Sequence, residues 1–299
     1  MISVIILTKN EEADLPKCLN SLSWTDDVHV LDSLSTDDTC EIAMAYGAKV
    51  TINPFVSFGK QRNFALENIE TKYNWILFLD ADEVATPEFA ACLLSNVKNA
   101  DANTAGFYCC WKMMLENRWL KNSDNFPKWQ LRVVNKGKVT YTDFGHGQKE
   151  DEVLGSVGYL KVPYLHYGFS KGWSHWIERH NRYSTLEAIA RLDNIPPFKN
   201  IFSKHGSTRN PALKSWLIKV PGWPILRFIH AYVFNLGFIE GTPGLTYCIN
   251  LSFYEHMIKI KMREIELARK NTIKANTTDT PRLDLNEKQA MGLLHKELS

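Results

Sequence analysis

Two acidic residues directly behind a strongly apolar run constrain this chain more than any other feature. Trp75-Ile76-Leu77-Phe78-Leu79 is followed at once by Asp80-Ala81-Asp82-Glu83. We expect the apolar run to form a buried strand that ends at the ligand-binding edge of an open α/β sheet. Because residues i and i+2 of an extended segment point to the same side, Asp80 and Asp82 can bind one polar group together. Their hard oxygen ligands suit a divalent cation that bridges phosphates. The alternative is a solvated turn that carries helix-capping acids.

Short apolar runs alternate with helical patterns in the segment before these aspartates. We expect strands over residues 3–7, 28–31, 49–52 and 75–79, with helices between them, including one over 61–69. This alternation predicts a doubly wound, mostly parallel sheet of the α/β class. The chain has no Gly-x-Gly-x-x-Gly and no Gly-Lys-Ser/Thr loop, which argues against a dinucleotide site and against a P-loop NTPase.

Four polar motifs occur in a fixed order over residues 1–90. They are Ile5-Ile6-Leu7-Thr8-Lys9-Asn10-Glu11-Glu12, Leu31-Asp32-Ser33-Leu34-Ser35-Thr36-Asp37-Asp38-Thr39, Gly59-Lys60-Gln61-Arg62-Asn63 and Phe78-Leu79-Asp80-Ala81-Asp82-Glu83. Together they resemble the family 2 glycosyltransferases, and in particular the bacterial branch that builds lipopolysaccharide core, capsule or exopolysaccharide. Residues 145–151 and 163–184 resemble that branch as well. The resemblance implies a GT-A fold, a mostly parallel sheet flanked by helices, followed here by a C-terminal helical region.

The resemblance also implies a nucleotide-sugar site, with a UDP-sugar as the expected donor. Asp82 is expected to ligate Mg²⁺ or Mn²⁺, together with Asp80, which could instead face the ribose or a metal-bound water. The residues expected to bind the nucleotide-sugar are Thr8, Asn10, Glu11, Asp32, Lys60, Arg62, Asp80 and Ala81. Alternatively, Asp32 caps a helix, and Lys60 and Arg62 only solvate a helix start. The chain departs from the family at Leu34, where a glycine is expected; we expect an altered turn and unchanged chemistry.

An inverting transferase needs a base that takes a proton from the acceptor hydroxyl. After residue 90, only the segment 143–152 concentrates suitable groups among glycines. Glu150 is our first candidate, Asp151 the second and His146 the third. The alternative is a solvated hairpin without a catalytic role. Inversion itself is implied by the family resemblance alone.

The second half of the chain differs in character from the first. We expect a catalytic domain over residues 1–167, a helical region over 168–270 and a polar, partly disordered tail over 271–299. Residues 197–263 carry nine Lys/Arg and two acids, a local balance of 9 − 2 = +7, and eight Phe, Trp and Tyr residues are interleaved with that charge over residues 198–238. This mixture favours peripheral contact with an anionic membrane, where rings sit at the headgroups. The alternative is a helical subdomain with buried aromatics. No nucleic-acid-binding module is recognisable.

Composition bounds the location that we expect for this protein. The 299 residues are 44% hydrophobic and 23% charged, and no apolar stretch approaches the roughly 20 residues that span a bilayer. Met1 leads straight into the first expected strand, so we expect no signal peptide. The six dispersed cysteines fit buried, reduced thiols. We therefore expect a cytoplasmic protein, peripheral at the inner face of the cytoplasmic membrane.

Together with the patterns above, the family resemblance implies an inverting, metal-dependent glycosyltransferase that extends a lipid-linked or oligosaccharide acceptor in bacterial surface polysaccharide or lipopolysaccharide biosynthesis. The nearest alternative enzyme is a nucleotidyltransferase that makes an activated sugar. Such an enzyme normally carries a Gly-rich loop after its first strand, and residues 8–12 contain no glycine. A third hypothesis is a sugar-nucleotide-binding pseudoenzyme that scaffolds a glycan assembly complex. The presence of Asp80, Asp82 and several candidate bases argues against it.

Overall fold

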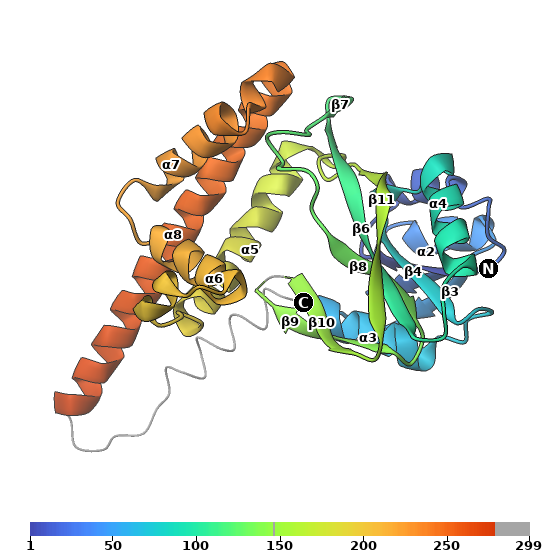
Figure 1. Cartoon of the computed structure of the whole chain (residues 1–299), viewed down its shortest axis with the longest axis horizontal. Helices are drawn as coiled ribbons and strands as arrows, with labels where there is room; N and C mark the ends of the chain where they lie inside the picture. The colour runs from blue at the N-terminus through green and yellow to red at the C-terminus, as the bar shows by residue number, and fades with distance from the viewer. Residues whose placement is uncertain (146, 279–299) are drawn as a thin grey trace.

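The computed structural model describes residues 1–145 and 147–278 (Figure 1). The elements in chain order are β1 (Ser3–Thr8), α1 (Leu15–Asn20), β2 (Val28–Asp32), α2 (Thr39–Ala45), β3 (Lys49–Ile52), α3 (Phe58–Asn68), β4 (Trp75–Asp80), β5 (Glu83–Val84), α4 (Pro87–Lys98), β6 (Thr104–Leu115), β7 (Arg118–Trp119), β8 (Gln130–Asn135), β9 (Val139–Phe144), β10 (Gly147–Val153), β11 (Ser156–His166), α5 (Gly172–Asp193), η1 (Phe198–Phe202), α6 (Gly206–Leu217), α7 (Trp223–Ile229), η2 (His230–Phe234), η3 (Gly237–Glu240) and α8 (Gly241–Thr278). Figure 1 shows the strands gathered in one half of the molecule and helices α5 to α8 in the other.

One nine-stranded sheet organises the first half of the chain. Its order is β3-β2-β1-β4-β8-β6-β11-β5, with β7 paired to β6, and β9 and β10 form a separate two-stranded sheet. The pairs β3–β2, β2–β1, β1–β4 and β6–β11 are parallel, whereas β8 runs antiparallel between β4 and β6. This largely parallel sheet, flanked by helices, confirms the predicted α/β class.

The apolar run in β4 contributes to a hydrophobic core on each face of the sheet. Leu77 and Leu79 pack in the core that includes residues of α1 and α4. Ile76 and Phe78 point the other way and pack in the core that includes residues of α3. Because side chains alternate along a strand, an uninterrupted apolar run is what a strand covered on both faces requires.

The elements predicted before Asp80 are present, with small shifts at their ends. The predicted strand 49–52 coincides with β3. The predicted helix 61–69 starts earlier, at Phe58 in α3, because the hydroxyl of Ser57 accepts a hydrogen bond from the backbone N–H of Lys60 at 3.3 Å. A side chain that satisfies such a free N–H fixes the helix start.

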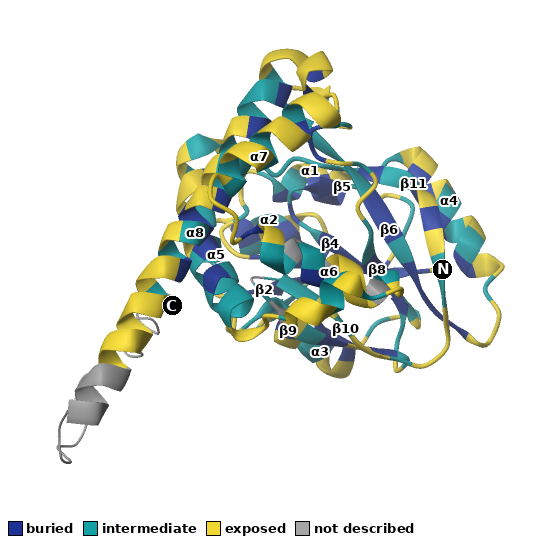
Figure 2. Ribbon diagram, turned by 60° about the vertical axis from the view of Figure 1, so that its left-hand side comes forward, coloured by how far each residue is buried: buried dark blue, intermediate teal, exposed yellow. Residues whose placement is uncertain are grey.

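Helices form the second half of the described chain, and α5 lies alongside α8 (Figure 2). A small apolar core joins them, made of Ala188, Ile218, Ile258 and Met262. The first helix starts at Gly172, four residues after the expected start of the helical region at 168. The expected boundary at 270/271 falls inside α8, which continues to Thr278. The rest of the expected tail, residues 279–299, lies outside the described residues. None of the helices in the described part of the chain combines the length and apolar character that crossing a membrane requires.

A buried carboxylate joins the helical half to the sheet half. Glu240, at the end of η3, is only 4% exposed. Its oxygens accept hydrogen bonds from the backbone N–H of Asn122 at 2.6 Å and of Ser123 at 3.2 Å, in the loop after β7. Nearby, Arg118 Nη2 donates to the carbonyl of Ile239 at 3.0 Å. These bonds fix the position of η3 relative to β7.

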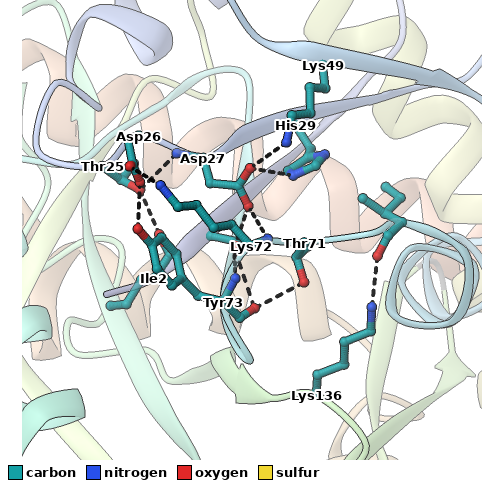
Figure 3. A network of polar contacts seen from close by, with 12 residues as sticks. Ile2, Thr25, Asp26, Asp27, His29, Lys49, Thr71, Lys72, Tyr73 and Lys136 are labelled. Carbon is teal, nitrogen blue, oxygen red and sulfur yellow. Dashed lines mark hydrogen bonds and ion pairs between the residues drawn. The ribbon is translucent and has the colours of Figure 1, made fainter.

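A second buried carboxylate, Asp27, joins the amino ends of the sheet strands (Figure 3). It accepts hydrogen bonds from Ser3 Oγ at 2.7 Å, from the backbone N–H of Lys72 at 2.7 Å and from Lys49 Nζ at 2.9 Å. His29 Nε2 lies 3.1 Å from Asp27 Oδ1, the oxygen that Lys49 also contacts. Burial alone would raise the pKa of Asp27, but these hydrogen bonds outweigh it and hold the pKa well below its usual range.

The Asp27 network predicts a specific acid dependence of stability. Because the folded pKa is lowered, the stability contributed by Asp27 is present above its ordinary pKa of 3.8 and is lost as the pH falls below that value. Asp27→Asn should therefore lower the free energy of unfolding at pH 7 by about 2–3 kcal/mol. It should also flatten the loss of stability between neutral and acid pH, as measured by denaturant titrations.

The matched control is Asp26→Asn, since the neighbouring Asp26 is half-exposed and pairs with the exposed Lys72. This variant should change the free energy of unfolding at neutral pH little. Equal effects of the two substitutions would contradict the role given to Asp27.

Candidate functional site

Three predicted site residues lie at one edge of the sheet because of strand register. In the parallel pairs, Leu7 of β1 lies opposite Asp80 of β4, and Thr8 lies opposite Asp32 of β2. The carboxyl ends of β1, β2 and β4 therefore meet. This is the edge at which open α/β sheets bind ligands.

Asp32 organises the loop that follows β2. Its carboxylate is buried and accepts hydrogen bonds from Thr8 Oγ1 at 2.9 Å and from the backbone N–H of Ser35 at 2.7 Å. The residue at the N-cap of α2 is Asp38, six positions further on, so Asp32 is not the cap of that helix. Asp32 instead holds the loops after β1 and β2 together.

The departure at Leu34 preserves a left-handed turn. Leu34 has φ of 63°, a conformation that glycine adopts freely and that a side chain makes costly. The side chain of Leu34 is exposed, and its backbone carbonyl accepts a hydrogen bond from Lys9 Nζ at 2.8 Å. Leu34 therefore keeps the left-handed conformation that the expected glycine would adopt without strain, and its side chain makes that conformation costly.

Asn10 and Glu11 lie in the loop after β1 and contact two different parts of the chain. Asn10 Oδ1 accepts a hydrogen bond from the backbone N–H of Thr36 at 2.8 Å, and the Asn10 carbonyl accepts one from Lys171 Nζ at 2.6 Å. Lys171 also forms an ion pair with Glu11 Oε1 at 2.7 Å. Burial raises the pKa of Glu11 to about 7, although Lys171 acts in the opposite direction.

The two predicted cations of α3 lie in different surroundings. Lys60 is exposed, as expected of a residue that solvates a helix start. Arg62 is 1% exposed, and its Nη2 lies 3.7 Å from Asp80 Oδ1. Its guanidinium carbon lies 5.2 Å from the ring centroid of Phe78, and two of its nitrogens have no hydrogen-bond partner in the described chain. Arg62 is therefore part of the carboxylate cluster at the end of β4.

Asp80 is held by a second arginine that the sequence analysis did not identify. Arg132 of β8 donates to both oxygens of Asp80, at 3.2 and 2.8 Å, and to Glu83 Oε1 at 2.9 Å. Burial alone would raise the pKa of Asp80, but the charge of Arg132 outweighs burial and keeps it well below its usual range. The sequence feature that could have identified Arg132 is its position as a charged residue inside the apolar run from Leu131 to Val134.

Asp82 faces a histidine from the far end of the sheet. His166 is the last residue of β11 and lies opposite Glu83 of the neighbouring strand β5. Its Nε2 lies 3.4 Å from Asp82 Oδ2. Burial alone would lower the pKa of His166, but Asp82 raises it to about 9. His166 belongs to the segment 163–184 that carried part of the family resemblance, although no role was assigned to it.

The donor set around Asp82 fits a metal ion that is shared with a substrate. No group of three or more His, Cys, Asp or Glu side chains capable of holding a metal occurs among residues 1–145 and 147–278. The carboxylate of Asp82 and, once it has lost its proton, the imidazole of His166 provide two adjacent donors, and Asp80 lies next to them at the end of β4. Mg²⁺ and Mn²⁺ are commonly held by one or two protein groups and completed by phosphate oxygens and water.

A cleft opens beside Asp82, between the sheet edge and the start of α5. It is small, and its lining mixes the acids Glu11, Asp14 and Asp82 with Lys171, His175 and Arg179, of which Lys171 forms the ion pair with Glu11. Ala81 lines the adjoining part of the same cleft. Carboxylates and cations that line one cleft together suit a ligand that carries phosphate groups next to a metal ion.

Two candidate bases, Glu150 and Asp151, lie on β10 of the β9–β10 hairpin, outside the lining of this cleft. Glu150 is half-buried on β10 and accepts a hydrogen bond from the hydroxyl of Tyr108 on β6. Asp151 is exposed on the same strand. His146 lies outside the described residues.

The predicted site residues that the structure brings together at the sheet edge are Thr8, Asn10, Glu11, Asp32, Arg62, Asp80, Ala81 and Asp82.

Comparisons with known proteins agree with this geometry. The family model of glycosyl transferase family 2 matches residues 3–148. An uncharacterised glycosyltransferase of Rickettsia typhi is 27% identical over 285 residues, which cover 91% of this chain and 90% of the relative. The lipopolysaccharide core biosynthesis glycosyltransferase LpsC of Rhizobium meliloti is 27% identical over 199 residues, which cover 64% of this chain and 72% of LpsC.

A solved structure has the same fold over most of its length. The mannosyltransferase PcManGT of Pyrobaculum calidifontis, in complex with GDP-Man and Mn²⁺, superimposes with a TM-score of 0.51 at 15% identity. The match covers 87% of this chain and 86% of that one. The motifs, the sheet and these similarities agree. Residues 3–148 form a glycosyltransferase family 2 domain, and the protein is a glycosyltransferase with a GT-A fold.

Proposed function

We propose that the protein is an inverting, metal-dependent transferase that moves a sugar from a nucleotide-sugar to a lipid-linked glycan. The observation that carries this proposal is the pairing of Asp82 with His166 at 3.4 Å, beside a cleft that Lys171 and Arg179 also line. UDP-sugars are the expected donors, and GDP-mannose is the alternative because PcManGT was solved with it. Similarity to LpsC supports a role in lipopolysaccharide biosynthesis. The acceptor would be met at the cytoplasmic face of the membrane.

In this proposal, each group at the sheet edge has one task in donor binding. Asp32, with Thr8, forms the floor under the nucleoside, and Asn10 and Glu11 line its side. Arg62 compensates the charge of Asp80, whereas the exposed Lys60 can reach a diphosphate only from outside. Asp82 and His166 would hold Mg²⁺ or Mn²⁺, with Asp80 next to them. When bound, the cation stabilises negative charge on the departing nucleoside diphosphate.

The transfer step needs a base on the acceptor side. The acceptor oxygen attacks the anomeric carbon, the bond from that carbon to the diphosphate breaks, and the hydroxyl proton passes to a carboxylate. Glu150 is the first candidate because it is half-buried and held by Tyr108, which fixes its direction. Asp151 and His146 follow in that order.

The first test concerns the donor site. Asp82→Ala should abolish Mn²⁺-dependent binding of UDP in calorimetric titrations and abolish sugar transfer. The reason is that the substitution removes one of two adjacent donors. Asp101→Ala, at an exposed position in the loop before β6, should bind UDP normally. Normal turnover by Asp82→Ala would rule out the metal role.

The products of the reaction separate the transferase from its enzyme alternative. A glycosyltransferase releases a nucleoside diphosphate from a nucleotide-sugar, whereas a nucleotidyltransferase releases pyrophosphate from a nucleoside triphosphate. Nucleotide binding without either product would favour the pseudoenzyme hypothesis. If UDP does not bind, GDP and the other nucleoside diphosphates are the next ligands to titrate.

The second test concerns the base. Glu150→Gln should lower the rate of transfer by at least about 100-fold and leave the affinity for UDP unchanged, because proton removal and donor binding use different residues. Glu152→Gln, two residues further along the same strand and exposed, is the matched control. An unchanged rate for Glu150→Gln would move the role to Asp151 or His146.

A further inference from the structure

An unusually apolar surface covers the end of the helical half that carries α7. Within residues 217–239, ten large apolar side chains are exposed, with Phe234 at 74% and Ile225 at 65%. We call this surface the basic–apolar face. Its apolar members are Leu217, Val220, Ile225, Leu226, Ile229, Val233, Phe234, Leu236, Phe238 and Ile239. Figure 2 shows the segment around α7 largely in the colour of exposed residues. Exposed apolar side chains that gather within one segment are typical of a binding site for a partner or for a membrane.

The charge of this region has one sign. No Asp or Glu occurs between Asp193 and Glu240, a stretch that contains six Lys/Arg. The two acids that follow point inward: Glu240 binds the loop after β7, and Glu255 accepts hydrogen bonds from Arg191 at 2.8 and 3.1 Å. The segment of the basic–apolar face therefore presents cations and apolar groups, with no acid of its own to balance them.

The aromatic residues of the region are not packed into a buried subdomain. Phe198, Phe202, Phe234 and Phe238 are exposed, and Trp216, Trp223, Phe228 and Tyr232 are half-buried. Lys219 Nζ lies 4.2 Å from the ring centroid of Trp216, so a cation and a ring share one exposed edge. Rings beside cations at a surface are typical of contact with lipid headgroups.

The face is also held firmly against the rest of the protein. Glu240 and the carbonyl of Ile239 are bonded to the loop and strand around β7, as described above. Trp223, at the start of α7, donates from Nε1 to Glu255 of α8 at 3.0 Å. Both ends of the α7–η3 segment are therefore anchored, and a rotation of the whole segment that buried its apolar side chains would break these bonds.

We propose that the basic–apolar face docks on an anionic lipid bilayer. The apolar side chains of α7 to η3 enter the boundary between headgroups and acyl chains, and Lys219 and Arg227 lie at the headgroup phosphates. Apolar burial and electrostatic attraction together provide the two contributions that stable interfacial binding needs. This inference extends the proposed function by saying how the enzyme meets a lipid-linked acceptor. Vesicle binding is measured without sugar transfer, so the proposed transferase activity can fail while the proposed membrane docking holds, and the reverse.

The test is sedimentation of the whole protein with phosphatidylcholine vesicles, with and without phosphatidylglycerol. Lys219→Gln combined with Arg227→Gln should weaken binding to the anionic vesicles roughly 25-fold at low salt, about fivefold per cation. Added salt should shrink that difference, because exposed charges are screened. Phe234→Ser combined with Phe238→Ser should weaken binding at every salt concentration.

The matched control is Leu154→Ser, which removes a 54% exposed side chain from the turn between β10 and β11. It should bind vesicles as the wild type does. UDP titration of each variant checks that the catalytic half is intact. The proposal is overturned if the wild type does not bind anionic vesicles, or if the face variants bind as tightly as the control. Self-association that the same variants abolish, without vesicle binding, would assign the face to a second copy of the chain.

Discussion

The candidate site depends on one guanidinium, that of Arg132. Three carboxylates fall within the four residues 80–83, and side by side in a largely buried turn they would repel one another. Arg132 reaches this turn because β8 runs antiparallel next to β4, and it binds Asp80 and Glu83 together. Glu83 in turn accepts a hydrogen bond from the backbone N–H of Asp80 at 2.8 Å. With two of the acids neutralised in this way, the third, Asp82, faces the cleft. Loss of one partner of such a buried pair is strongly destabilising.

The sequence allowed prediction of the elements whose neighbours are close in the chain. The run from Trp75 to Leu79 could be assigned as a covered strand because it is apolar on both faces. The order of strands and helices then indicated a largely parallel sheet. Parallel register at its carboxyl edge was enough to bring Thr8, Asp32 and Asp80 together. The family resemblance supplied the chemistry for those positions.

The parts of the site that escaped prediction are contacts between distant segments. Arg132 follows Asp80 by 52 residues, His166 follows Asp82 by 84, and Lys171 follows Glu11 by 160. Each meets its partner only because of the positions of β8 and β11 in the strand order of the sheet, and the local sequence does not predict those positions. The same reason separates Arg62 from Lys60. Two residues are just over half a turn of α3, so Arg62 lies toward Asp80 whereas Lys60 lies in solvent.

The anchoring of η3 by Glu240 has a geometric consequence for any activity at a surface. A rigid body bound through one fixed face loses two rotations and one translation, so every bound molecule presents its cleft at the same height and tilt. The search for an acceptor then becomes diffusion in two dimensions with the orientation already set. Glu240, the carboxylate that binds Ser123 and holds η3 in place, thereby fixes the orientation of the catalytic sheet relative to the plane in which its acceptor would move.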